Sequence, residues 1–249
     1  MRQALLEIYR TSLKPSDTVF NIYLARPLAT PIVALGERYR WHPNWVSWMG
    51  LMFMVLGSLV FSIPAFFPAV PLDNWTLIVA GVTAVELSYL CDCADGQLAR
   101  RLKLASKMGA ELDFLVDELK AYLLLVGLTL NWWGTTPSES APLLWGLAGM
   151  LSLGVALAST RFIRNPVVQA SGAFQTSSHG ESAQTRHQKK PFWWIWAIAR
   201  LITQYPQSLP IFALLNLLPW FVMVYTVLHL GYSLLRLAQM LRSTLIDTE

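Results

Sequence analysis

Long apolar stretches alternate with short polar segments along the whole chain. Six of these stretches have about the 20 residues that an α-helix needs to cross a hydrocarbon core of about 30 Å. They cover residues 45–66, 75–91, 112–133, 141–163, 201–218 and 219–241. Only Asn216 and Pro219 punctuate the last two, which are therefore either two short spans with a tight turn or one long kinked helix. The pattern predicts an all-α polytopic membrane protein with six transmembrane helices.

The composition supports a membrane protein. Hydrophobic residues make up 54% of the chain and charged residues 14%, and the mean hydropathy is +0.42. These values are not those of a soluble globular protein. We expect a single membrane domain over residues 1–249, with a cytoplasmic or interfacial segment at 1–42 that includes a juxtamembrane helix. The polar stretch 169–190 is expected to be a flexible cytoplasmic loop.

The positions of Lys and Arg predict the orientation in the membrane. Loops rich in these residues stay on the cytoplasmic side. The segments 67–74, 134–140 and 216–220 contain neither residue, whereas the segments between them are basic. This alternation predicts six spans with both termini in the cytoplasm. The net charge of +4 is then an orientation signal, and no basic face with interleaved aromatic residues suggests nucleic-acid binding.

Four aspartates lie within this apolar background, at spacings that suit helices. The chain reads D-C-A-D-G-Q-L-A-R from Asp92, then has eight residues, then reads G-A-E-L-D-F-L-V-D up to Asp117. Asp92 and Asp95 share one helix face, and Asp113 and Asp117 share another. Since the two helices are consecutive spans, we expect them to be antiparallel neighbours whose four carboxylates converge near the cytoplasmic side.

Ionised carboxylates at membrane depth are costly, so their presence predicts a function. Aspartate oxygens suit hard cations such as Mg²⁺, Mn²⁺ or Ca²⁺, and two divalent ions would balance four carboxylates. Gly96, Gly109 and Ala99 would leave room for a nucleotide or diphosphate, although close helix packing also explains small residues. Arg100 either contacts anionic oxygens or extends to the lipid headgroups, and the second alternative is favoured for three further cations. These are Arg101, Lys103 and Lys107.

The string from Asp92 to Asp117 resembles the full signature of the CDP-alcohol phosphotransferase family, D-x-x-D-G-x-x-A-R, eight residues, G-x-x-x-D-x-x-x-D. Every fixed position matches. The segment Pro43 to Ser47 also resembles the P-N-x-x-T/S entry to the family's first span. The six-span pattern extends the resemblance over most of the chain.

The resemblance implies an integral membrane enzyme of phospholipid biosynthesis. It would displace CMP from a CDP-linked donor, often CDP-diacylglycerol, by attack of a small alcohol on the β-phosphorus. In a bacterium it would lie in the inner membrane with its site on the cytoplasmic side. Family members are commonly dimers, but the residues themselves demonstrate none.

The resemblance also implies roles for individual residues. Two Mg²⁺ or Mn²⁺ ions would be held by Asp92, Asp95, Asp113 and Asp117. The CDP site would include Gly96, Ala99, Arg100 and Gly109, with Asn44 as an addition. Asp117 would be the general base for the acceptor hydroxyl. Because a carboxylate bound firmly to a cation is a poor base, either Asp117 is loosely coordinated or the metal itself acidifies the alcohol.

The acceptor is less defined. Arg161, Arg164 and Arg200 lie near cytoplasmic span ends, where members that use phosphorylated acceptors such as glycerol 3-phosphate or inositol phosphate keep basic residues. A guanidinium binds two phosphate oxygens at once. The alternative is that these arginines only set the orientation of the protein in the membrane. Two functions from other classes stay open. They are a Mg²⁺-dependent membrane prenyltransferase, which would have well-separated Asp motifs, and a non-enzymatic ion transporter, which would show repeated halves.

Overall fold

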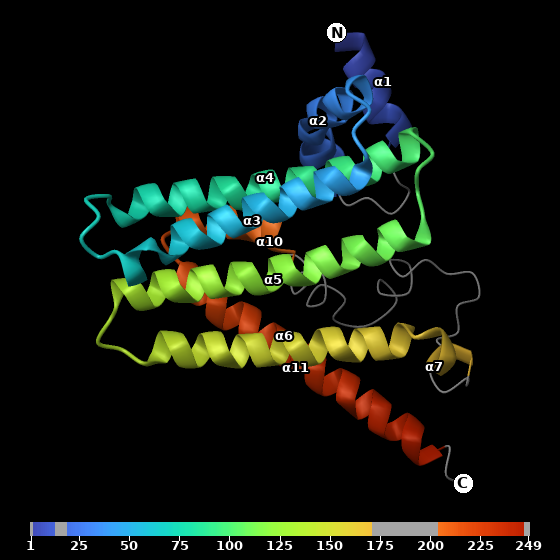
Figure 1. The fold of residues 1–249 in the computed structure, drawn as a ribbon. Helices are drawn as coiled ribbons and strands as arrows, with labels where there is room; N and C mark the ends of the chain where they lie inside the picture. Colours follow the sequence, from blue (N-terminus) through green and yellow to red (C-terminus); the bar gives the residue numbers. More distant parts are fainter. Residues whose placement is uncertain (1, 13–18, 171–203, 247–249) are drawn as a thin grey trace. The chain divides into compact units, whose positions relative to one another are not determined.

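The computed structural model describes residues 2–12, 19–170 and 204–246, and all regular secondary structure in them is helical (Figure 1). The prediction of an all-α protein is therefore confirmed. The chain divides into two compact units, Met1–Pro137 and Ser138–Glu249.

Four helices are long and apolar enough to cross a membrane. They are α3 (Pro43–Phe66), α4 (Asn74–Arg101), α6 (Ala141–Arg164) and the Leu218–Arg242 part of α11 (Leu218–Ile246). Each corresponds to a predicted span, so the protein is a multi-pass integral membrane protein.

The other two predicted spans differ from these four. Helix α5 (Lys107–Thr135) is 29 residues long, but its first half carries six charged side chains, and only residues 121–135 are free of them. In the predicted fifth span the structure describes a ten-residue helix, α10 (Tyr205–Leu214). Asn216, with a φ of 56°, then turns the chain into α11. Of the two alternatives for residues 201–241, one long kinked helix is wrong: a tight turn separates two helices, of which α11 is long and apolar enough to cross a membrane and α10 is not.

In the first unit, α3 packs along both α4 and α5 (Figure 1). The two helices that carry the aspartates run antiparallel, as predicted, but their closest backbone packing is with α3 rather than with each other. Side-chain hydrogen bonds join α4 and α5 directly. At the end away from the aspartates, the Asn131 amide donates to Asn74 Oδ1 over 3.0 Å.

Small residues permit this close packing. A Cβ built on Gly57 would lie 3.1 Å from the carbonyl oxygen of Gly81, and one built on Gly81 would lie 2.6 Å from the ring of Phe61. Phe61 is fully buried. On α5, a Cβ on Gly127 would lie 2.8 Å from the Cα of Ser58 on α3. Any larger side chain at these glycines would push the three helices apart.

The N-terminal segment folds into more than one helix. Helix α1 (Arg2–Ser12), a short π-helix η1 (Asn21–Ala25) and α2 (Arg26–Arg38) precede α3, and both α1 and α2 pack against α4. The fully buried Ala29 and Val33 of α2 join Ala94 and Leu98 of α4 in one hydrophobic cluster. The N-terminal helices therefore cover the segment of α4 that contains Asp92 and Asp95.

In the second unit, α6 packs along α11, and Ser233 donates to the carbonyl of Ser152 over 2.7 Å. A short helix, α7 (Pro166–Ala170), follows α6. Of the polar loop predicted at 169–190, residues 171–190 lie outside the described part of the chain.

Candidate active site

A short turn connects the two helices that carry the aspartates. Helix α4 ends at Arg101, Lys103 has a positive φ of 56°, and α5 begins at Lys107. The Ser106 hydroxyl oxygen caps α5 by accepting a hydrogen bond from the Gly109 amide at 3.0 Å. At its other end, α4 is capped by Asp73, and hydrogen bonds from the Thr76 hydroxyl and amide lower the pKa of Asp73. The turn is short enough to bring both halves of the predicted motif together.

Three of the four aspartates meet. One carboxylate oxygen each from Asp92, Asp95 and Asp113 lies within 4.8 Å of the others. Asp95 is buried, Asp92 is half-buried and Asp113 is exposed, so the group extends from the helix interface to the surface of the first unit. A set of oxygen ligands with one open side suits Mg²⁺ or Mn²⁺, which keep positions for water or phosphate oxygens. These three residues could hold a metal ion.

Asp117 does not belong to that group of three. It lies one helical turn after Asp113 on α5, and its Oδ1 is 3.5 Å from Nζ of Lys120. The same ammonium donates to Asp92 Oδ1 over 2.8 Å. Lys120 therefore bridges the two helices and links Asp117 to Asp92.

Ser47 of α3 fixes the orientation of Asp95. Its hydroxyl donates to Asp95 Oδ2 over 2.5 Å, and both residues are buried. Ser47 lies one helical turn after the start of α3, where the chain begins with Pro43 and Asn44. The serine of the P-N-x-x-S segment thus holds the most deeply buried carboxylate in position. A hydrogen bond of this kind orients a ligand before a metal binds.

The small residues of the motif face open space. A Cβ on Gly96 would have one neighbour within 4 Å, Nη1 of Arg100 at 3.4 Å. A Cβ on Gly109 would meet the cap atom Ser106 Oγ at 3.2 Å and Asn44 Oδ1 at 3.9 Å. Neither glycine is needed for close helix packing, unlike Gly57, Gly81 and Gly127. Ala99 is half-buried on the same helix as Gly96.

The arginines predicted for the acceptor belong to the other unit. Arg161 and Arg164 lie in the last turn of α6, and both are exposed. Arg200 falls outside the described residues.

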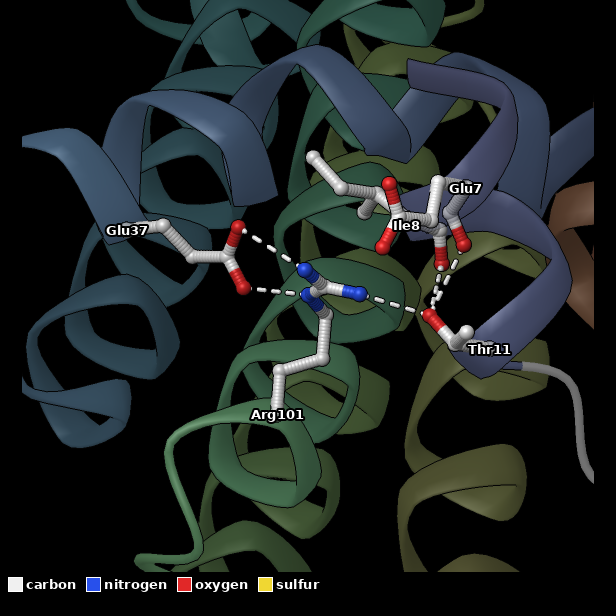
Figure 2. Close-up of polar contacts among 5 residues, drawn as sticks. All are labelled: Glu7, Ile8, Thr11, Glu37 and Arg101. Carbon is white, nitrogen blue, oxygen red and sulfur yellow. Dashed lines mark hydrogen bonds and ion pairs between the residues drawn. The ribbon is translucent and has the colours of Figure 1, made fainter. Parts of the chain in front are cut away.

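Arg101 differs from its prediction. Figure 2 shows its guanidinium between the N-terminal helices: it forms an ion pair with Glu37 of α2 and donates to Thr11 of α1 over 2.6 Å. The Thr11 hydroxyl in turn donates to the carbonyl of Glu7 over 2.8 Å (Figure 2). The expectation that Arg101 extends to lipid headgroups was wrong, because the N-terminal helices supply a carboxylate within its reach.

A second arginine strengthens the same contact. Nη1 of the buried Arg26, on α2, donates to the carbonyl oxygen of Cys93 over 2.9 Å. Cys93 lies between Asp92 and Asp95 in the sequence. The N-terminal helices are therefore attached to the part of α4 that carries the first two aspartates.

Comparison with known proteins agrees with this geometry. The model of the CDP-alcohol phosphatidyltransferase family matches residues 40–228. The chain belongs to this family. It is a membrane enzyme that transfers substituted phosphate groups in phospholipid synthesis. An uncharacterized protein of Aquifex aeolicus (strain VF5) is 33% identical over 148 residues, which are 59% of this chain and 69% of that protein.

Two residues of this phosphatidyltransferase were given no role from sequence. Ser47 was noted only as part of the entry to the first span, yet it contacts Asp95 directly. No role is assigned to Lys120 from the sequence. A lysine three residues after Asp117, inside an apolar stretch, shares a helix face with it, and intramembrane cations commonly pair with nearby carboxylates. That spacing was the available signal.

Proposed function

We propose that this phosphatidyltransferase moves a phosphatidyl group from a CDP-linked lipid donor, with CDP-diacylglycerol as the first candidate, to a small alcohol and releases CMP. The observation that carries this proposal is the convergence of Asp92, Asp95 and Asp113 from two helices within 4.8 Å. A cluster of this kind, open on one side, suits a diphosphate and its counter-ions. Membership of the family supports the CDP-linked donor.

In the proposed reaction, the acceptor hydroxyl oxygen forms a bond to the β-phosphorus of the donor. The bond between that phosphorus and the oxygen that bridges to the α-phosphate breaks, and CMP leaves with the electron pair. Two divalent ions, Mg²⁺ or Mn²⁺, would supply charge stabilisation to the attacking and leaving oxygens. Their proposed ligands are Asp92, Asp95, Asp113 and Asp117.

Asp117 is the proposed acceptor of the hydroxyl proton. Its carboxylate is exposed, and it is not one of the three whose oxygens meet within 4.8 Å. Lys120 is an ion-pair partner of this carboxylate, with Nζ 3.5 Å from Oδ1. This position favours a loosely coordinated Asp117 over the alternative in which a metal alone acidifies the alcohol.

The proposed CDP site consists of Asn44, Gly96, Ala99, Arg100 and Gly109. Its support is the open space at the two glycines, where a Cβ would meet no neighbouring helix backbone. The Arg100 guanidinium lies beside Gly96, within reach of an anion that approached it. A charged donor of several hydrogen bonds suits the diphosphate.

The proposed topology has six spans, cytoplasmic termini and a cytoplasmic active site, in the inner membrane if the host is a bacterium. The alternation of basic and non-basic segments supports it. We also propose that residues 1–249 work as a single domain, because the family match runs through both compact units.

A phosphorylated alcohol is the preferred acceptor, bound by Arg161, Arg164 and Arg200. The support is chemical: three guanidinium groups near predicted cytoplasmic span ends suit a phosphate. Replacing Arg164 with Gln should then raise KM for a phosphorylated acceptor while KM for the CDP-linked donor stays unchanged.

The test of the proposed function is CMP release by the purified protein in lipid nanodiscs. Radiolabelled CDP-diacylglycerol is supplied with Mn²⁺ or Mg²⁺ and, in separate reactions, glycerol 3-phosphate, inositol phosphate, serine and ethanolamine. We expect metal-dependent CMP release with one acceptor and a matching labelled lipid product. Metal-bound protein that releases no CMP from CDP-diacylglycerol with any of these acceptors would contradict the proposal.

A further inference from the structure

Lys120 is a buried cation inside the acidic site. Its side chain is 1% exposed, and its ion pairs among the described residues are with Asp92 at 2.8 Å and Asp117 at 3.5 Å. Both partners are proposed metal ligands. Lys120 therefore occupies a position where a divalent ion would otherwise interact with the same two carboxylates.

The surroundings of the ammonium hold it there. A Cβ built on Gly50 of α3 would lie 3.6 Å from Lys120 Nζ and 3.1 Å from both Cys91 Cβ and the Ser88 carbonyl oxygen. The ammonium therefore lies at the contact between α3 and α4, beside the helical turn of α4 that precedes Asp92. Glycine at position 50 leaves the space that the lysine head group uses.

The charges of the site are consequently uneven. Four carboxylates and one ammonium leave a formal charge of −3, which neither one nor two divalent ions balance. The two ends of the site also differ in geometry. Asp92, Asp95 and Asp113 already meet within 4.8 Å although Asp92 also pairs with Lys120, whereas Asp117 lies outside this group and has the ammonium at 3.5 Å. One metal position is preformed, and the other lies next to a fixed positive charge.

We propose that Lys120 makes the two metal positions unequal, so that the first ion binds at Asp92, Asp95 and Asp113 alone and the second binds at the Asp117 end only together with the donor diphosphate. This inference rests on the metal-dependent transfer proposed above. The diphosphate supplies the negative charge and the oxygen ligands that the Asp117 end lacks. Lys120 is a positioning residue: it acts on metal and donor through the carboxylates that it contacts.

A purely structural role for Lys120 makes a different prediction. If the lysine only joined α4 to α5, its loss would lower stability and would not tighten metal binding. If instead the Lys120 ammonium repels the second metal ion, that ion should bind more tightly when the ammonium is removed.

The experiment measures Mn²⁺ binding to purified protein in nanodiscs by the electron paramagnetic resonance signal of free Mn²⁺, with and without CDP. For the wild type we expect one tightly bound ion without CDP and two with it. For Lys120→Met, whose unbranched side chain is one atom shorter and uncharged, we expect the second ion to bind without CDP, with an affinity raised by roughly tenfold or more. Lys120→Arg should behave like the wild type.

Lys107→Met is the matched control, because it removes the same charge from the exposed first turn of the same helix. Its Mn²⁺ isotherm should match that of the wild type. Thermal unfolding in EDTA supplies a second measurement. Lys120→Met should unfold at a lower temperature than the wild type in EDTA, because its carboxylates lack a cation, and Mn²⁺ should raise its midpoint by more.

Two results would overturn the inference: coincident isotherms for Lys120→Met and the wild type, or two equally tight ions in the wild type without CDP. The second result decides the matter even if Lys120→Met does not fold. The proposed function fails separately. If Mn²⁺ binds and CMP is released while the isotherms coincide, only the role of Lys120 is wrong. If the protein neither binds Mn²⁺ nor releases CMP, the proposed transfer is wrong.

Discussion

Glycines occur in both halves of the unit formed by α3, α4 and α5, but their surroundings differ. In the half away from the aspartates, a Cβ on Gly57, Gly81 or Gly127 would lie 2.6 to 3.1 Å from atoms of a neighbouring helix. In the half with the aspartates, a Cβ on Gly96 would meet only Arg100 of its own helix. The first three glycines bring helices together, whereas Gly96, in the motif that carries the aspartates, faces open space. We call the two halves the packed half and the site half.

Polar groups differ between the halves in the same way. In the packed half they satisfy one another: Ser58 donates to the Leu123 carbonyl over 2.8 Å, and Asn131 donates to Asn74. In the site half, carboxylates gather within 4.8 Å and repel one another. The packed half must therefore hold the helices in place while the site half carries charges that destabilise it. Active sites commonly lower stability in return for function.

The largest expected effect comes from a charge of the site half. Asp95→Asn should reduce CMP release by at least about a hundredfold, because it removes a buried ligand of the proposed metal. Replacing residues that only hydrogen-bond to metal ligands already lowers metal affinity or activity by about ten- to a hundredfold. The thermal midpoint in EDTA should not fall, since one of the mutually repelling carboxylates is gone. CMP release and a thermal scan of the same preparation measure the two effects.

Asp73→Asn is the control for that substitution. Asp73 caps α4 at the packed end, where asparagine caps about as well. It should keep full CMP release. Turnover by Asp95→Asn close to that of the wild type would remove Asp95 from the metal site.

The glycine comparison is tested by one substitution made in each half. Gly96→Leu should abolish CDP binding and leave the thermal midpoint nearly unchanged, because its Cβ enters open space. Gly81→Leu should destabilise the protein by at least about 1 to 3 kcal/mol, since the buried Phe61 ring is 2.6 Å from the Cβ position. Equilibrium dialysis with labelled CDP and thermal unfolding measure both variants.

The two glycine variants should fail in opposite assays. If Gly96→Leu kept its CDP affinity and lost stability, the distinction between the halves would be wrong, and Gly96 would be a packing residue. If Gly81→Leu folded but lost CDP binding at its normal midpoint, the site would extend further along α4 than proposed.

A smaller effect is expected from the hydrogen bond that orients Asp95. Ser47→Ala should weaken Mn²⁺ binding by about tenfold, because it removes the donor at 2.5 Å from a metal ligand. Ser62→Ala, on the same helix, is the control: Ser62 donates to the Ser58 carbonyl within α3. Its Mn²⁺ affinity should match that of the wild type. Equal losses in the two variants would show that general loosening of α3 is responsible, not the contact with Asp95.

The sequence predicted the parts of this structure that depend on local periodicity. The 3- and 4-residue spacing of the aspartates placed them on one face of each of two helices. The short basic segment that connects these helices predicted that they are antiparallel. Length and hydropathy located α3, α4, α6 and most of α11. These features depend on neighbouring residues in the chain, so the local sequence pattern is enough to predict them.

The rest depended on contacts between segments far apart in the chain. The sequence around Asp95 does not predict its contact with Ser47, which is 48 residues away. The sequence around Arg101 likewise does not predict its contact with Glu37, which is 64 residues away. The antiparallel pair was foreseen, but the position of α3 against both helices was not, because apolar faces do not specify their partner. Lys120 is the exception: its three-residue spacing from Asp117 is a local feature, and the sequence alone is enough to predict that contact.

The smallest expected effect concerns the ion pair that attaches the N-terminal helices to the site half. Arg101 and Glu37 are 22% and 25% exposed, so solvent screens their attraction. Arg101→Gln and Glu37→Gln should each cost about 1 kcal/mol or less, and the double variant should cost less than their sum. Thermal unfolding of the two single variants and the double variant measures the coupling. Each variant should release CMP at nearly the wild-type rate, because the buried Arg26 still binds the Cys93 carbonyl. A large loss of CMP release at an unchanged thermal midpoint would mean that the ion pair adjusts the carboxylates themselves, and the site half would then have to include α2.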